Sequence, residues 1–274
     1  MARQHFDPMG TTALITGASS GLGAEFAREF ARRGADLVLV ARRQDRLEAL
    51  AVELAEAFGT ESTVIPLDLT APDAIEELVR DIDSRGIRVA SLVNNAGFGS
   101  YGRFGDADEE RLFDEVQLNV LALTRLSRAL WPALVAHSRT SPGNGALVNV
   151  ASTAAFQPIP FMAVYGATKA YVLSLTEALW YEAKGTGLKV TTLCPGPTAT
   201  EFPDVADNEE AFLGAVQTAE QVIATAFRAL DARSTPPSVV SGFGNAAAAR
   251  TVGLAPKRLL LTGLGRVTTP RRQR

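Results

Sequence analysis

A tyrosine and a lysine four positions apart, Tyr165 and Lys169 in YGATK, have the residue types and the spacing for proton transfer. A phenol can donate or accept a proton, and an ammonium one helical turn away lies on the same helix face. Lowering a phenol pKa from near 10 by about 3 units requires roughly 4 kcal/mol. A unit charge about 4 Å away supplies about that much at an effective dielectric of about 20. The pair therefore predicts acid–base chemistry in which Lys169 lowers the pKa of Tyr165.

Such a pair arises by chance in many chains, so the segment TGASSGLG, residues 16–23, carries more weight. Its glycines, Gly17, Gly21 and Gly23, allow a tight turn and a close approach of the backbone to a pyrophosphate. A helix that begins near Leu22 would direct free N–H groups and its positive end at that anion. A plain glycine-rich turn is the alternative. The position directly after the first apolar run favours a dinucleotide site.

The end of the second apolar run, LVLVARRQDRL, bears on which dinucleotide is bound. An acidic residue there would bond the adenosine ribose and indicate NAD(H). The chain has Ala41 at that position, followed by Arg42 and Arg43, and an arginine pairs well with a 2′-phosphate. The alternative is two solvated arginines at a helix start, although positive charge there opposes the helix dipole. The sequence therefore predicts NADP(H) rather than NAD(H), with Arg42 as the better candidate of the two.

The elements that must position these residues follow an alternating pattern. Short, nearly continuous apolar runs are typical of strands buried on both faces, and amphipathic segments between them are typical of helices. The runs lie at 12–16, 36–41, 62–67, 90–95, 145–151, 188–193 and 237–241, and the helical segments at 22–33, 44–58, 72–85, 108–137, 163–184 and 209–230. This pattern predicts an α/β, Rossmann-like, doubly wound parallel sheet of about seven strands flanked by helices on both faces. We expect Trp131-Pro132 to kink or break its helix.

No internal repeat or low-complexity linker divides the chain, which predicts a single NAD(P)-binding domain over residues 1–274. Its core would span about 10–240, and residues 242–274 form an apolar and basic extension. That extension can pack on the core, cover a substrate cleft or touch a membrane surface, and the sequence does not choose among these.

Composition narrows the class of protein. A net charge of −3 gives no electrostatic footprint for nucleic acid. One cysteine, Cys194, and two histidines make a metal site improbable. The first residues lack the apolar region of a secretory signal, and no run of about 18 uncharged apolar residues appears. We expect a cytoplasmic protein without metal.

Several motifs occur in order and together resemble the short-chain dehydrogenase/reductase family, in its single-domain, NADP(H)-preferring form. They are TGASSGLG, Asp68 in PLDL, NNAG at 94–97, Asn119 in QLNV, Ser152 in VNVAS, YGATK and PGPTAT at 195–200. The resemblance extends from about residue 10 to 240.

The resemblance implies roles for individual residues. Asn119, Ser152, Tyr165 and Lys169 match the catalytic residues of the family. Asp68 would bond the adenine amino group beside Leu69, Asn94 would stabilise the fourth strand, and Thr198 would approach the nicotinamide carboxamide. The cofactor would be bound by Gly17, Ser19, Ser20, Gly21, Leu22, Gly23, Arg42, Asp68, Leu69, Asn95, Ala96, Gly97, Tyr165, Lys169, Pro195, Gly196 and Thr198.

Such a set of residues suits the interconversion of a ketone or aldehyde and an alcohol. Hydride addition leaves charge on the carbonyl oxygen, which Tyr165 can protonate while the Ser152 hydroxyl bonds it. Asn119, unfavourable within a helix, either faces solvent or holds water for a proton relay from Lys169.

Substrate and partners are less readable. Phe98, Tyr101, Phe104, Phe156, Ile159 and Phe161 suit a hydrophobic carbonyl compound, and core packing explains them almost equally well. The segment at 195–212 is typical of a mobile lid. The helices at 108–137 and 163–184 resemble those that pair subunits in the family, so we expect a homodimer or homotetramer. Two alternatives are a non-catalytic NADP(H)-sensing protein and a peripheral membrane enzyme that acts on lipid-like ketones through its C-terminal segment.

Overall fold

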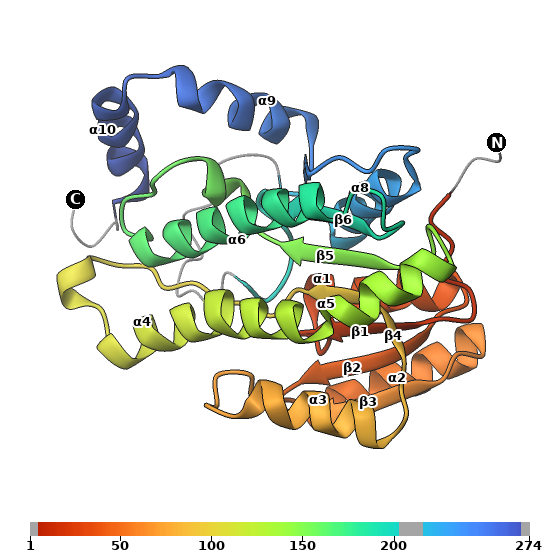
Figure 1. Ribbon diagram of the computed structural model, residues 1–274. Helices are drawn as coiled ribbons and strands as arrows, with labels where there is room; N and C mark the ends of the chain where they lie inside the picture. Colours follow the sequence, from red (N-terminus) through yellow and green to blue (C-terminus); the bar gives the residue numbers. More distant parts are fainter. Residues whose placement is uncertain (1–4, 203–215, 270–274) are drawn as a thin grey trace.

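A computed structural model of the protein describes residues 5–202 and 216–269. Its strands form one parallel sheet in the order β3-β2-β1-β4-β5-β6-β7 (Figure 1). They are β1 (Thr12–Thr16), β2 (Asp36–Ala41), β3 (Ser62–Pro66), β4 (Val89–Asn94), β5 (Ala146–Val150), β6 (Lys189–Cys194) and β7 (Ser238–Val240). The order reverses at β1, which pairs with both β2 and β4. A crevice at the carboxyl ends of these strands is the expected ligand site of such a sheet.

Helices cover both faces of the sheet, and this explains the continuous apolar runs of its strands. On one face α1 (Gly21–Arg32), α2 (Gln44–Phe58) and α8 (Ala219–Asp231) pack against Ile15 and its neighbours. On the other face α3 (Ala74–Ser84), α5 (Leu123–Thr140) and α6 (Ala163–Glu182) pack against Leu14. Successive strand residues therefore contribute to two different cores. The predicted fold class is confirmed.

The expected helix at 108–137 is three consecutive segments. It consists of α4 (Glu109–Val116), a π-helical turn (Gln117–Ala122) and α5. A break at Pro132 is wrong, because α5 continues through it to Thr140, and the alternative of a kink there stays a prediction. Pro132 and Arg128 are both exposed. The carbonyl that the proline leaves without a helical partner therefore lies on the solvent side, where water can bond it.

The structure also differs from the expected elements in three short helical turns and in the residue at which α8 begins. The turns are Phe104–Asp106, Thr153–Phe156 and Val252–Leu254. The last expected helix, 209–230, corresponds to α8, which begins at Ala219; residues 209–215 lie outside the described residues.

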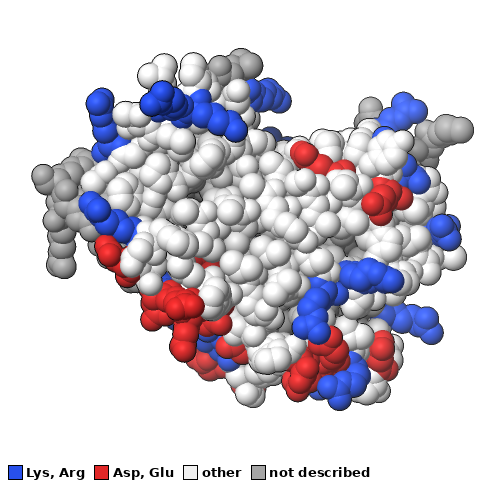
Figure 2. Space-filling view, turned by 60° about the vertical axis from the view of Figure 1, so that its left-hand side comes forward, with Lys and Arg blue, Asp and Glu red and all other residues white. Residues whose placement is uncertain are grey.

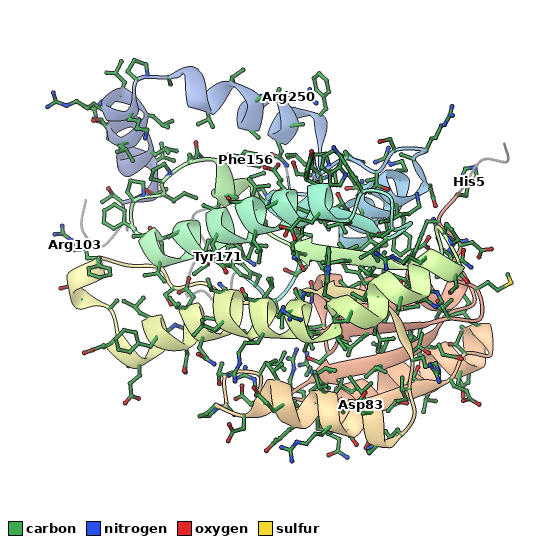
Figure 3. The ribbon with its side chains drawn as sticks, in the orientation of Figure 1. His5, Asp83, Arg103, Phe156, Tyr171 and Arg250 are labelled. Atoms are coloured by element: carbon green, nitrogen blue, oxygen red, sulfur yellow. The ribbon has the colours of Figure 1, made fainter. Side chains whose placement is uncertain are left out.

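The C-terminal extension forms α9 (Phe243–Thr251) and α10 (Lys257–Thr268). Helix α9 contacts β7 and the turn that ends at Phe156, and Phe156 itself lies between α6 and α9 (Figure 3). The Tyr101 hydroxyl donates to the carbonyl of Thr268 over 2.5 Å, which ties the end of α10 to the loop after β4. Leu264 and Thr268 line the crevice. The extension therefore packs on the core through α9 and lines the cleft through α10, and its contact with a membrane surface stays a prediction.

Among the described residues, no helix combines the length and the apolar character needed to cross a bilayer.

Candidate active site

A cavity of about 830 Å³ opens at the carboxyl ends of the strands, where the sheet order reverses. It brings together the glycine loop, the residues after β2 and β4, and the ends of β5 and β6. The expected site residues that line it are Gly17, Ser19, Ser20, Gly21, Leu22, Arg42, Asp68, Leu69, Asn95, Ala96, Gly97, Ser152, Tyr165, Lys169, Pro195, Gly196 and Thr198. Gly23 and Asn119 are not part of the lining, and each lies behind it.

The glycine loop has the backbone that its sequence predicts. Gly17 and Gly21 have φ angles of +66° and +54°, which glycine adopts without strain. A Cβ at Gly23 would lie 2.1 Å from the carbonyl oxygen of Gly17, so any larger residue there would displace the loop. The Asn95 amide donates to the carbonyl of Thr16 over 3.0 Å and fixes the loop to the end of β4. Helix α1 begins at Gly21, so its first N–H groups point into the cavity mouth.

The two arginines after β2 differ in what they contact. Arg42 is 75% exposed, and its guanidinium lies 3.9 Å from the Asp68 carboxylate. Arg43 donates to the Ser20 hydroxyl over 2.8 Å and to the Ser19 hydroxyl over 3.0 Å. The structure therefore places Arg43, which sequence reasoning ranked second, directly against the glycine loop. The two serines of TGASSG could have indicated this contact in the sequence. The glycine loop to which they belong lies beside the end of β2, where Arg43 follows.

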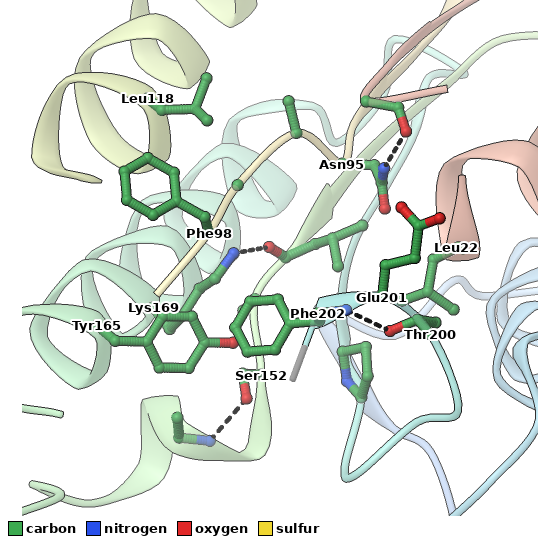
Figure 4. Close-up of a pocket in the computed structure, with 18 of the residues that line it drawn as sticks. Leu22, Asn95, Phe98, Leu118, Ser152, Tyr165, Lys169, Thr200, Glu201 and Phe202 are labelled. Carbon is green, nitrogen blue, oxygen red and sulfur yellow. Dashed lines mark hydrogen bonds between the residues drawn. The ribbon is translucent and has the colours of Figure 1, made fainter. Parts of the chain in front are cut away.

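Arg43 also forms an ion pair with Glu201, whose carboxylate lies 2.9 Å from the guanidinium. Arg46 contacts the same carboxylate, and these two guanidinium groups lower the pKa of Glu201 to about 2. Glu201 belongs to the segment after β6 and faces the cavity (Figure 4). These ion pairs thus connect the residues after β2 to the segment after β6 across the mouth of the cavity.

Asn94 has the structural role that the resemblance implies, whereas the contacts of Asp68 hold its own turn and leave its expected bond to adenine a prediction. The Asn94 amide donates to Asn149 over 2.8 Å and to the Ser127 hydroxyl over 2.9 Å, so it joins β4 to β5 and α5. The Asp68 carboxylate accepts from the amide and the hydroxyl of Thr70, which holds the turn after β3.

Tyr165, Lys169 and Ser152 converge on one wall of the cavity. Tyr165 lies in the first turn of α6, and its hydroxyl points toward the side of the cavity where Ser152 lies (Figure 4). The Ser152 hydroxyl accepts from the amide of Ala154 over 3.1 Å, which orients it at the end of β5. The Lys169 ammonium donates to the carbonyl of Val150 over 3.0 Å. Tyr165 and Lys169 are both buried.

Burial dominates the protonation of this pair. It raises the pKa of Tyr165 to about 12, against a smaller opposing effect of the Ser152 hydroxyl. Burial also lowers the pKa of Lys169 to about 8. The expectation that Lys169 lowers the pKa of Tyr165 is therefore wrong for the protein alone. Desolvation is the largest influence on both groups, and by lowering the pKa of Lys169 it weakens the positive charge that was expected to act on Tyr165.

Asn119 lies in the π-helical turn and is buried. Its amide donates to the carbonyl of Phe98 over 2.8 Å and to the Thr168 hydroxyl over 3.1 Å, and its oxygen accepts from the amide of Phe98. The alternative in which it faces solvent is wrong. Its contacts anchor the loop after β4 beside Lys169.

The other end of the cavity carries several apolar side chains, beside charged residues of the α4 region such as Arg111, which stacks over Phe98. Phe98 and Ile159 line it as expected, together with Met162, Phe202 and Leu264, which sequence reasoning did not single out. The Phe202 ring packs on Tyr165 with 5.3 Å between the ring centres. Phe202 and Leu264 had a signal, since they belong to the expected lid and to the apolar C-terminal segment.

Four of the six expected apolar residues are not part of this end. Phe104 is 70% exposed, Tyr101 packs on Phe161, and Phe156 packs against a small core cluster. Of the expected lid at 195–212, residues 203–212 lie outside the described residues. Within the described part of the chain, no three metal-binding side chains lie close enough together to hold an ion.

Comparison with known proteins shows the family to which this chain belongs. The profile of the family described as short chain dehydrogenase matches residues 11–211. The very-long-chain 3-oxoacyl-CoA reductase of Bos taurus is 30% identical over 202 residues, which are 72% of this chain but 62% of that protein, so the similarity leaves part of the bovine protein unmatched. Sulfoacetaldehyde reductase 2 of Chromohalobacter salexigens is 36% identical over 196 residues, 71% of this chain and 75% of that protein.

A solved structure resembles this one over most of its length. A short-chain dehydrogenase from Sphingobium yanoikuyae in complex with NADPH has a TM-score of 0.77 and 35% identity. The match covers 91% of this chain and 94% of that chain.

Proposed function

The chain belongs to the short chain dehydrogenase family of oxidoreductases, and we propose that it interconverts a ketone or aldehyde and an alcohol with NADP(H). The observation that carries this proposal is the convergence of Tyr165 and Ser152 on the cavity that the glycine loop opens into. The backbone that would bind the dinucleotide and the acid–base side chains therefore line the same cavity. A protein that only senses the cofactor would not need the acid–base side chains.

The cofactor, when bound, supplies hydride to the carbonyl carbon or accepts it from the alcohol. The hydroxyl groups of Ser152 and Tyr165 bind the substrate oxygen, and Tyr165 donates its proton to that oxygen as negative charge develops. A raised pKa keeps the Tyr165 phenol protonated at neutral pH, which suits the acid needed for reduction. Lys169, which is anchored by Val150, stabilises the resulting phenolate and has donors left for the ribose.

Cofactor choice rests on Arg43 and, secondarily, on Arg42. A 2′-phosphate beside Ser19 and Ser20 would meet the Arg43 guanidinium, which already contacts both hydroxyls. Position 41, where an acidic residue would repel that phosphate, is an alanine. Arg42 is free to turn from its long contact with Asp68. NADPH in the Sphingobium yanoikuyae structure supports this choice. We therefore assign NADP(H) and place NAD(H) second.

The remaining expected residues have places in the same proposal. Gly17, Gly21 and the start of α1 would hold the pyrophosphate, while Asp68 and Leu69 would meet the adenine. Asn95, Ala96, Gly97, Pro195, Gly196 and Thr198 would surround the nicotinamide half. The Thr198 hydroxyl, which bonds the carbonyl of Gly196 over 2.9 Å, lies at the end of the cavity formed after β6.

The substrate is proposed to be a carbonyl compound with an apolar body. Phe98, Ile159, Met162, Phe202 and Leu264 form the wall beyond the reacting hydroxyls. The names of the two relatives indicate a long acyl thioester and a small sulfonated aldehyde, so they do not narrow the substrate class. An apolar wall favours ketones or aldehydes with aliphatic or aromatic substituents.

A second copy of the chain is the proposed partner. Helix α6 carries few charged residues, and Tyr171 and Tyr181 are exposed on it. Figure 2 shows a broad uncharged area between the basic side chains near α9 and α10 and the acidic side chains of α4. A helix with so few charges is normally covered. We propose a homodimer or homotetramer formed through α5 and α6 from single-domain subunits.

The decisive test is a panel of aliphatic, aromatic and thioester carbonyl compounds with NADPH, followed by the loss of NADPH absorbance, and of alcohols with NADP⁺ in reverse. We expect turnover of apolar carbonyl compounds that the Tyr165→Phe variant lacks. Absence of turnover across the panel, with NADPH bound, would support the sensing alternative.

A further inference from the structure

Helix α4 buries a carboxylate beside the site. Among the residues of α4, all of them described, Glu115 alone is buried, with 0% of its surface exposed. Neither of its oxygens has a hydrogen-bond partner in the structure. A buried, unpaired carboxylate is costly for folding, so its presence calls for a reason in function.

The position of Glu115 is defined by three elements. It lies one helical turn before Asn119 on the same side of the chain, and α4 packs against α6, which carries Tyr165 and Lys169. The loop after β4 lies between these elements. A Cβ at Gly97 would lie 3.3 Å from the Lys169 ammonium, and a Cβ at Gly99 would lie 3.0 Å from the Tyr165 ring. Ser100, the next residue, is one of the groups that lower the pKa of Glu115.

The charged and titratable groups that face this carboxylate come from each of these elements. Arg111 lies one turn earlier on α4, bonds the carbonyl of Gly99 and stacks over Phe98. Lys169 faces it from α6, and Ser100 faces it from the loop with its hydroxyl buried and without a normal hydrogen bond. Cys194 on β6 is a further titratable group of this region. Like Glu115, it raises the pKa values of Tyr165 and Lys169.

Burial raises the pKa of Glu115 to about 7, and Ser100, Arg111 and Lys169 oppose this rise. The influence is mutual: the Glu115 carboxylate raises the pKa of both Tyr165 and Lys169. These effects keep the phenol protonated and Lys169 positively charged. Both are the protonation states that carbonyl reduction needs at the start of the reaction.

We propose that Glu115 is a positioning residue for proton transfer, whose buried negative charge holds Lys169 as the ammonium and Tyr165 as the phenol. This inference rests on the proposed function, since it assigns Glu115 a part in the same reaction. Glu115 acts through Lys169 and Tyr165 and does not contact the substrate. Its carboxylate favours carbonyl reduction and opposes alcohol oxidation, because oxidation begins with the phenolate.

The pH profile of alcohol oxidation tests the proposal. Glu115→Gln keeps the size of the side chain and removes its charge, so the pKa of Tyr165 falls. We expect the rising limb of kcat/KM for oxidation with NADP⁺ to move to lower pH by about one unit, the usual effect of one nearby charge. Glu109→Gln, an exposed residue of the same helix that does not line the cavity, is the matched control and leaves the limb in place. An unchanged limb in Glu115→Gln, or an equal shift in the control, would overturn the inference.

Thermal unfolding against pH gives a second readout that needs no turnover. The folded-state pKa of Glu115 is raised, so the native protein binds the proton more tightly and loses stability as pH rises from about 4.5 to about 7. Glu115→Gln removes that loss, and we expect its Tm to exceed that of the unchanged protein by several degrees at pH 8 but not at pH 4.5. Equal differences at both pH values would also overturn the inference. If the unchanged protein lacks turnover, the proposed function fails by itself, and this readout still decides whether Glu115 titrates near neutrality.

Discussion

The Lys169 ammonium lies 5.8 Å from the centre of the Tyr165 ring and donates its hydrogen bond to the carbonyl of Val150. The lysine is thus held at the end of β5, and its ammonium lies beside the phenol ring without a hydrogen bond to the phenol oxygen. Because both side chains are buried, desolvation is the largest influence on both of their pKa values. A positive charge on the bound nicotinamide ring would act on the same phenol in the oxidation direction.

The first prediction concerns the proton donor. Tyr165→Phe keeps the ring that packs on Phe202 and removes the proton. We expect kcat for carbonyl reduction to fall by about 10²- to 10⁴-fold, the usual contribution of general acid catalysis. The Kd for NADPH, measured by fluorescence titration, should stay within about threefold, because the phenol contributes at most one hydrogen bond to binding.

Tyr171→Phe is the matched control for that variant. Its hydroxyl lies 3.0 Å from the Thr124 hydroxyl on the outer side of α6, away from the cavity. Near-normal turnover in Tyr165→Phe, or an equal loss in the control, would contradict the assigned role.

The second prediction separates the two arginines after β2. Arg43→Ala should weaken NADPH binding by about 10- to 100-fold, the range for loss of a charged hydrogen bond, and should weaken NADH binding far less. Arg42→Ala should cost NADPH affinity less than Arg43→Ala does, because Arg42 is exposed and has only a long contact with Asp68. Titration of each variant with both cofactors checks this.

Two outcomes would count against this assignment of Arg43. One is an equal loss of NADPH and NADH affinity, which would indicate that Arg43 only supports the loop. The other is a larger effect of Arg42→Ala, which would restore the order expected from the sequence.

The third prediction tests whether α10 contributes to substrate binding. Leu264 lines the cavity, whereas Leu259 on the same helix is 71% exposed. Leu264→Ala should lower kcat/KM for apolar carbonyl substrates by about tenfold, the usual effect of losing part of an apolar wall. Leu259→Ala should leave it unchanged. If both variants behave like the unchanged protein, α10 has no part in substrate recognition.

The fourth prediction concerns the pH dependence of reduction. Burial lowers the pKa of Lys169 to about 8, so its ammonium is lost as pH rises through that value. We expect kcat/KM for carbonyl reduction to fall above pH 8, because the neutral amine no longer stabilises the phenolate. Lys169→Arg keeps its charge at every accessible pH. Its activity should be lower, and the fall near pH 8 should be absent; a fall at the same pH would assign that limb to another group.

The sequence by itself determined the class of fold and which motifs lie at the carboxyl ends of the strands. Continuous apolar runs that alternate with amphipathic segments have one well-packed solution, a parallel sheet covered on both faces. The carboxyl ends of its strands meet at one edge, so motifs at the ends of β1, β4, β5 and β6 had to gather there. The spacing of Tyr165 and Lys169 likewise depends only on the pitch of a helix.

Tertiary structure alone decided what depends on burial and on contacts between distant segments. Arg43 meets Ser19 and Ser20 because the end of β2 lies beside the glycine loop, and neighbouring arginines in a sequence give no sign of which one reaches it. The pKa of Tyr165 is raised because packing removes water from around it. Glu115 resembles its exposed acidic neighbours in the sequence and is buried where α4 packs against α6 and the loop after β4. Periodicity records which side chains share an element, whereas solvation depends on everything packed around them.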